Sequence, residues 1–193
     1  MIEYISGKIA ELTPATAVLE TNGVGYEINI TLPDHVAMCN AETARLYIHE
    51  SIREDAHVLY GFLDRQTRML FRHLIGVSGV GPGTARLILS SLTASDLMTA
   101  ISTGNDAMLK AVKGIGGKTA QRIIVDLRDK INAEEIALNT KLAMPESGFD
   151  ESLAALVTLG FTRDASRKAL RKLYDSNPAI SVEQAVGDAL KML

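Results

Sequence analysis

The sequence predicts a mixed α+β chain built from several small domains, because its residue pattern changes along its length. Residues 1–62 alternate apolar and polar side chains as β-strands do, and residues 64–132 follow the period of helices. A polar stretch without aromatic residues follows, and then a second helical segment. With 193 residues, 47% of them hydrophobic, the chain can bury several small cores. We expect domains at 1–63, 64–132 and 149–193, with a linker at 133–148, helical at its start.

Five short runs in the first segment are expected to form a small barrel or sandwich. The runs cover residues 4–10, 16–21, 25–31, 44–49 and 56–62. Asn22-Gly23 predicts a tight type I′ hairpin, since that turn needs positive φ at both central residues. Glu54 and Asp55 fall between the last two runs, so two adjacent carboxylates are expected at a hairpin tip.

The charge of the chain is distributed unevenly. Residues 1–64 carry 3 basic and 10 acidic side chains, residues 65–132 carry 10 and 4, and residues 133–193 carry 7 and 9. A basic middle between acidic flanks suggests a segment that faces a polyanion. The alternative is that these basic side chains only decorate helix surfaces.

The basic segment contains an internal repeat at an offset of 35 residues. Residues 74–89 align with residues 109–124 through the shared pattern Val-x-Gly-[Val/Ile]-Gly-x-x-Thr-Ala and a following apolar helix. The loops consist of Gly79, Val80 and Gly81 in the first copy and Gly114, Ile115 and Gly116 in the second. All four glycines are expected in the left-handed region, and Val80 and Ile115 are expected to fill the core.

Each repeat is expected to bind a phosphate through backbone N–H groups at the start of its second helix. The spacing excludes a P-loop, because Val112 stands where that motif needs glycine. It also excludes a dinucleotide fingerprint, because Thr84 and Thr119 replace the third glycine. What remains resembles the helix-hairpin-helix motif, twice in tandem, which would grip a nucleic-acid backbone without reading bases. The alternative for a single copy is an ordinary turn between two helices. The rest of the predicted contact set is Gly83, Thr84, Arg86, Gly117, Lys118, Thr119 and Arg122, with Lys118 and Arg122 as the main phosphate contacts.

The last segment predicts a bundle of three helices at 150–159, 162–174 and 181–193. Thr162 and Ser181 stand where N-caps are expected, and Gly160 ends the first helix. A core of about 45 residues is marginal, so surplus apolar surface would serve a partner. The main candidates are Leu170, Leu173 and Tyr174 on the second helix. Ala185, Leu190 and Leu193 on the third are considered with them, and each of the six could instead belong to the core.

No pattern of catalytic, cofactor-binding or metal-ligating residues stands out. The four histidines lack metal-ligand spacing, Cys39 is the single cysteine, and no signal peptide or membrane span is expected, which predicts a cytoplasmic protein. The same residues allow three alternatives: a nuclease using the acidic hairpin tip, a glycosylase using Asp126 or Asp129, and a single-strand-binding barrel. The first lacks further ligands, the second lacks an aromatic pocket, and the third conflicts with the acidic first segment.

Several segments together resemble the RuvA family of bacterial Holliday-junction-binding proteins. They are residues 1–7, 22–27 and 53–62, both hairpins and the C-terminal helices, and the resemblance spans essentially the whole chain. It implies an N-terminal OB-fold, a tandem helix-hairpin-helix domain, a flexible linker and a C-terminal domain of ubiquitin-associated type. That last domain would bind the hexameric RuvB motor ATPase.

The resemblance also implies a flat homotetramer that holds the junction open for branch migration in recombination and repair, with the RuvC resolvase in a larger complex. A second tetramer would enclose the DNA as an octamer. Glu54 and Asp55 map to the family's acidic pin, which keeps strands apart at the crossover. One departure is Gly117-Lys118, where members often carry two lysines. Another is Pro82-Gly83, which offers few side-chain donors.

Overall fold

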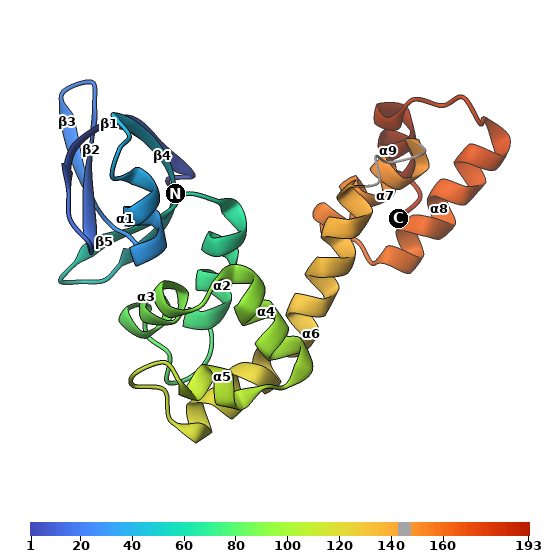
Figure 1. The fold of residues 1–193 in the computed structure, drawn as a ribbon. Helices are drawn as coiled ribbons and strands as arrows, with labels where there is room; N and C mark the ends of the chain where they lie inside the picture. Colours follow the sequence, from blue (N-terminus) through green and yellow to red (C-terminus); the bar gives the residue numbers. More distant parts are fainter. Residues whose placement is uncertain (143–147) are drawn as a thin grey trace. The chain divides into compact units, whose positions relative to one another are not determined.

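The computed structural model describes residues 1–142 and 148–193, with side chains described over residues 1–131 and 148–193 (Figure 1). The chain divides into two compact units, Met1–Ala133 and Glu134–Leu193. The first unit holds a β-barrel followed by helices, and the second holds a helical bundle. No helix in the described part of the chain is long and apolar enough to cross a membrane.

The first five strands close into a barrel in the order β1-β2-β3-β5-β4. They are β1 (Tyr4–Leu12), β2 (Thr16–Thr21), β3 (Val24–Asn29), β4 (Thr43–Ile52) and β5 (His57–Phe62). β3 pairs with β5 in parallel and every other neighbouring pair is antiparallel. Asn22 and Gly23 have φ of 50° and 79°, as the predicted hairpin requires. The five predicted strands are thereby confirmed, and Leu19, Ile28 and Leu46 fill the barrel interior.

The helix α1 (Leu32–Met38) was not predicted. The third predicted run was too long, since β3 ends at Asn29 and the chain turns into the helix at Thr31. The Thr31 hydroxyl caps the helix by accepting from the Asp34 N–H, and Pro33 lies in the first turn. The capping pattern was present in the sequence, but a helix of seven residues gives little periodicity.

Five further helices begin in the first unit. They are α2 (Arg65–Ile75), α3 (Pro82–Ser91), α4 (Ala94–Thr103), α5 (Asp106–Lys110) and α6 (Gly117–Leu142). Asp64 caps α2 by accepting from the Thr67 N–H at 2.7 Å. Phe71 on α2 packs against Phe62 of β5 with ring centroids 5.0 Å apart, and both side chains are buried. The helices therefore share packed surface with the barrel, and the two form one unit.

The second unit contains the three helices that the sequence predicts: α7 (Gly148–Thr158), α8 (Arg163–Ser176) and α9 (Val182–Leu190). Thr162 and Ser181 cap α8 and α9 through their side chains, and Gly160 has φ of 101°, so these predictions are confirmed. Within the predicted linker 133–148, α6 continues to Leu142. The part of that linker at 143–147 lies outside the described residues.

Candidate nucleic-acid interface

The two copies of the repeat have the same backbone hydrogen bonds. In the first copy the Val80 N–H donates to the Val77 carbonyl at 3.0 Å. In the second copy, 35 residues later, the Ile115 N–H donates to the Val112 carbonyl at 3.1 Å. The helix that follows starts alike in both copies, since Ala85 bonds to Gly81 and Ala120 bonds to Gly116, each at 2.9 Å. The repeat in sequence is therefore a repeat in structure.

Val80 and Ile115 are 4% and 6% exposed, which confirms that each fills the core beneath its loop. The expectation of four left-handed glycines is right for two of them, Gly79 at φ of 89° and Gly114 at φ of 90°. It is wrong for the second glycine of each loop, because neither has a positive φ. Gly81 instead has φ of −85° and ψ of 171°, an extended conformation that precedes a helix.

No contact within the chain requires glycine at Gly81 or Gly116, the last residue of each loop. A Cβ atom built on Gly81 or Gly116 would meet no other atom within 4 Å, and the same holds at Gly83 and Gly117. Neither a left-handed backbone nor close packing therefore requires glycine at these four positions. Glycine also serves where another backbone must approach closely, so these open surfaces are suited to contact with a phosphate backbone.

The two helices begin at Pro82 and Gly117, so Thr84 and Thr119 lie in their first turns and not at their starts. N–H groups of a first helical turn lack an acceptor within the helix and attract anions. In the second copy the first turn offers three such groups, but in the first copy Pro82 has no N–H to offer. The second hairpin is therefore the better backbone donor.

The three predicted basic contacts differ in where their side chains lie. Lys118 is exposed in the first turn of α6, with no carboxylate bound to it by any described contact. Arg122, also exposed, donates from Nη1 to the Ser78 carbonyl at 3.1 Å, so it links the second copy to the loop of the first. Arg86 extends instead to the barrel, where Nη1 donates to the Ala15 carbonyl at 3.1 Å and to Asn29 Oδ1 at 2.7 Å.

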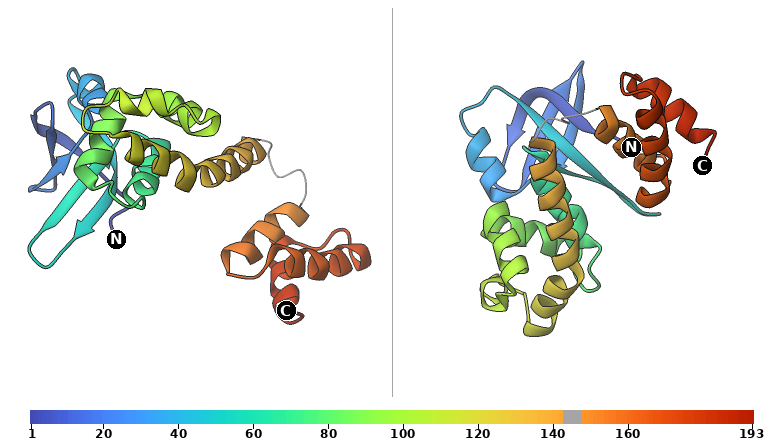
Figure 2. Two further views of the ribbon diagram at one scale, coloured as in Figure 1. Left: turned by 90° about the horizontal axis from the view of Figure 1, so that it is seen from below. Right: turned by 90° about the vertical axis from the view of Figure 1, so that its right-hand side faces the viewer.

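The two carboxylates lie at the end of the β4–β5 hairpin, as predicted. Arg53 and Ala56 close the turn, with the Arg53 N–H donating to the Ala56 carbonyl at 2.8 Å. Glu54 and Asp55 are the two residues between them, and both are exposed. We call this pair the acidic tip. The left view of Figure 2 shows this hairpin projecting from the barrel.

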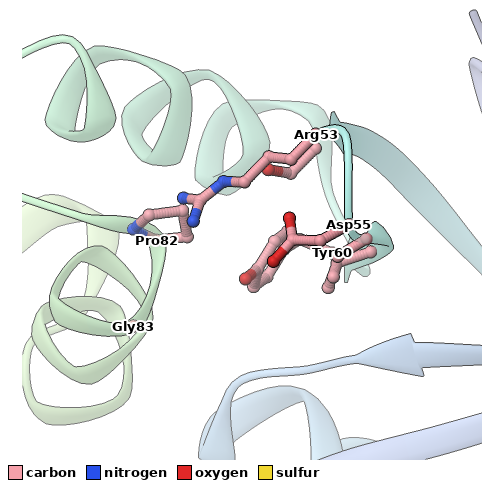
Figure 3. A pocket seen from close by; sticks show the side chains of 8 residues that line it. Arg53, Asp55, Tyr60, Pro82 and Gly83 are labelled. Atoms are coloured by element: carbon pink, nitrogen blue, oxygen red, sulfur yellow. The ribbon is translucent and has the colours of Figure 1, made fainter.

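A cavity of about 240 Å³ joins the acidic tip to the first hairpin. Its walls come from the β4–β5 hairpin and the start of α3, and consist of Ser51, Arg53, Asp55, Ala56, Val58, Tyr60, Pro82 and Gly83. Figure 3 shows the Arg53 side chain extending toward Pro82, with Asp55 and Tyr60 facing the same space. The Arg53 side chain beside the acidic tip therefore extends toward the start of α3. Sequence reasoning missed this role for Arg53, although its place beside two carboxylates was visible.

The structure of the second unit contradicts the prediction for one of the three main partner-binding candidates. Leu170 is fully buried in the core of the three helices, so it has no surface to offer a partner. Leu173 and Tyr174 are half-buried against that core, and the Tyr174 ring packs on Phe149 with centroids 5.4 Å apart. Within residues 148–193, the large apolar side chains that remain exposed are Val157, Leu159, Leu190, Met192 and Leu193.

Comparison with known proteins matches three family descriptions in chain order. RuvA N terminal domain covers residues 1–61, SAM-like Helix-hairpin-helix tandem covers 71–129, and RuvA, C-terminal domain covers 147–193. The Holliday junction branch migration complex subunit RuvA of Bacteroides fragilis is 50% identical over 201 residues, with both chains fully covered. The chain belongs to the RuvA family. The proteins of that name from Parabacteroides distasonis and Christiangramia forsetii are 51% and 39% identical, again over both full lengths.

Membership in the RuvA family accounts for the order of the elements seen here. The barrel is the family's OB-like N-terminal domain, and the repeats form its tandem helix-hairpin-helix domain. The identity extends through the second unit, which corresponds to the C-terminal domain. Among the residues whose side chains are described, no group of three or more His, Cys, Asp or Glu could hold a metal ion.

Proposed function

We propose that the chain is the Holliday-junction-binding subunit of a branch migration complex. Its relatives are named as subunits of the Holliday junction branch migration complex. The observation that carries the proposal is the pair of hairpins with matching backbone bonds, linked through Arg122 and Ser78 and placed in one unit with the acidic tip. A phosphate-binding surface and a phosphate-repelling projection together suit a branched DNA better than a linear one.

The proposed binding surface uses the DNA backbone and not its bases. First-turn N–H groups, open glycines and the exposed Lys118 and Arg122 all suit phosphate oxygens. Such contacts carry no sequence information, so any junction sequence is expected to bind. Each phosphate contact releases counterions, which makes the affinity fall steeply with salt.

The acidic tip is proposed to act as a pin at the point where strands exchange. Its exposed carboxylates, Glu54 and Asp55, repel phosphates over roughly 8–10 Å at moderate salt. The Arg53 guanidinium, which extends toward Pro82, places a positive charge beside the tip. Repulsion at the tip and attraction beside it would direct a separated strand away from the crossover.

Assembly follows from the same proposal. Four subunits would surround the crossover with their barrels at the centre, and a second tetramer would complete an octamer on DNA. The second unit would recruit the hexameric RuvB motor ATPase through apolar side chains that its own core leaves exposed, such as Leu159 and Leu190. Residues 133–148 would serve as the linker between DNA-binding and motor-binding parts. RuvC would join a larger complex, and the work would take place in the cytoplasm.

The decisive experiment is a gel-shift titration of the full chain with a synthetic four-way junction and with linear duplex of one arm's sequence, at fixed salt. A preference of ~100-fold for the junction, about 2.7 kcal/mol, is expected. Equal affinities would contradict the proposal. Adding Mg²⁺ to the labelled junction tests the proposed non-enzymatic role, because a cleavage product without any partner would contradict it.

A further inference from the structure

Arg86 lies on the first phosphate-binding helix, yet its guanidinium is bonded to the barrel. From α3 it reaches the backbone carbonyl of Ala15, between β1 and β2, and the side-chain oxygen of Asn29 at the end of β3. Both acceptors are oxygens at hydrogen-bond distance, 3.1 and 2.7 Å. A guanidinium bonded to two fixed acceptors loses much of its freedom to move toward a phosphate.

Asn29 is itself held in place by a second strand. Its Nδ2 donates to the Leu59 carbonyl on β5 at 3.3 Å, which leaves Oδ1 to accept from Arg86. Leu59 lies four residues after Asp55 on the strand that carries the acidic tip. A continuous series of hydrogen bonds therefore connects the strand of the acidic tip, through Asn29 and Arg86, to the helix of the first hairpin.

The second copy of the repeat offers an internal comparison. The position equivalent to Arg86, 35 residues later, is Gln121, which is exposed. The second copy therefore has no arginine at this position, although it is the copy with the better N–H donors. A further contact of α3 lies one turn later, where Ser90 Oγ accepts from the N–H of Leu32, the first residue of α1, at 3.2 Å. Of these two contacts, Arg86 makes the one nearer the hairpin.

We propose that Arg86 is a positioning residue that fixes the first hairpin relative to the acidic tip, and thereby determines preference for a junction over a duplex. It acts through Asn29 and not by binding phosphate. A duplex can adjust to a displaced hairpin because it needs only backbone contacts. A junction must satisfy the hairpins and the tip at once, so its binding depends on their spacing.

The proposal rests on the proposed function, and the test separates the two. Full-length wild type, Arg86→Ala, Asn29→Ala and the double variant are titrated with a four-way junction and with linear duplex at several salt concentrations. The control variant is Arg171→Ala, which removes an exposed arginine of α8 in the second unit. Thermal unfolding by circular dichroism identifies any variant that fails to fold.

Each single variant is expected to lose roughly tenfold in junction affinity, with duplex affinity and the salt slope unchanged. The double variant should lose no more than either single one, because both break the same connection. Asn29→Asp keeps the side-chain size and the acceptor for Arg86 but loses the Nδ2 donor to the Leu59 carbonyl, so junction preference should fall as in Asn29→Ala. A general loss of packing would not predict this for a change that preserves side-chain size.

Two results would overturn the inference. If Arg86→Ala weakens junction and duplex alike and lowers the salt slope by about one while Asn29→Ala has no effect, Arg86 is a phosphate contact. If both variants bind the junction as wild type does, the connection has no role in recognition. A wild type without junction preference would instead contradict the proposed function.

Discussion

Arg122 on α6 donates a hydrogen bond to the carbonyl of Ser78, the residue that precedes the first loop glycine, at 3.1 Å. This bond joins two hairpins that lie 35 residues apart in sequence. It also occupies one lone pair of the Ser78 carbonyl. The guanidinium keeps further N–H groups for a ligand, so Arg122 can both connect the hairpins and contact DNA.

Lys118 and Arg122 are predicted to supply the main side-chain contacts to phosphate. Replacing each with alanine should weaken binding to every DNA sequence alike and reduce the slope of log affinity against log salt by roughly one per residue. The measurement is a set of binding isotherms across salt concentrations. Lys8→Ala, an exposed lysine on β1, serves as the control and should change nothing. Unchanged affinity in the double variant would remove the second hairpin from the interface.

The two glycines of the second loop should respond to alanine in opposite ways. Gly114→Ala places a Cβ on a backbone with φ of 90° and should destabilise the fold by about 1–2 kcal/mol, measured by urea unfolding. Gly116→Ala meets no atom of the chain and should leave stability unchanged, but weaken DNA binding by roughly tenfold. Gly187→Ala on α9, also in open space, is the control for DNA binding. Wild-type DNA binding by Gly116→Ala would contradict close approach of a phosphate there.

Charge reversal at the acidic tip should change the shape of DNA that the protein prefers. In the variant Glu54→Lys with Asp55→Lys, repulsion of phosphate becomes attraction, so duplex affinity should rise and junction preference should fall. The same gel-shift comparison measures both quantities. Reversal of the exposed Glu20 on β2 controls for net charge. Equal selectivity in the tip variant and wild type would show that the tip is not a pin.

His49 should make the stability of the first unit depend on pH. Burial lowers the pKa of His49, and the positive charges of Arg72 and Arg68 lower it further, while Glu50 opposes them. The folded pKa then lies below the unfolded value of 6.5, so the unfolded state binds the proton more readily. Above pH 6.5 His49 is neutral in both states, and the fold keeps its full stability. As pH falls from 6.5 through the folded pKa, the unfolded state is favoured by proton binding and the free energy of unfolding decreases.

Urea unfolding at about pH 7.5 and about pH 5.5 measures this effect. Wild type should lose stability at the lower pH, and His49→Phe should lose less, since phenylalanine cannot titrate and can still pack on Phe71, 5.4 Å away between ring centroids. His35→Gln on α1 is the matched control. An identical decrease in wild type and His49→Phe would assign the pH dependence to other groups.

Removal of residues 149–193 should separate DNA binding from motor stimulation. The shortened chain keeps the whole first unit and should bind a four-way junction with wild-type affinity. It should fail to stimulate ATP hydrolysis and branch migration by the RuvB motor. Full-length protein with Leu159→Ser and Leu190→Ser, both exposed, should show the same loss without losing its fold. Weakened junction binding by the truncated chain would place part of the DNA interface in the second unit.

Much of the fold could be predicted from the sequence because its signals are local. The Asn22-Gly23 turn, the caps Thr162 and Ser181, and the repeat of the hairpins each depend on residues a few positions apart. The burial of Val80 and Ile115 also followed from the pattern. The short helix α1 was not predicted, because its seven residues are too few to show a helical period and they directly follow a strand-like run.

Local patterns are enough to identify the residues of the two hairpins and the turn that carries two carboxylates. The contacts that these parts make depend on packing in three dimensions. Arg86 and Arg122 look alike in sequence, yet one bonds to the barrel and the other to the first loop. The sequence does not distinguish Leu170 from Leu173 and Tyr174 as a partner contact, but in the structure Leu170 is fully buried. A side chain's partner depends on which distant segments fold against it, and local spacing does not contain that information.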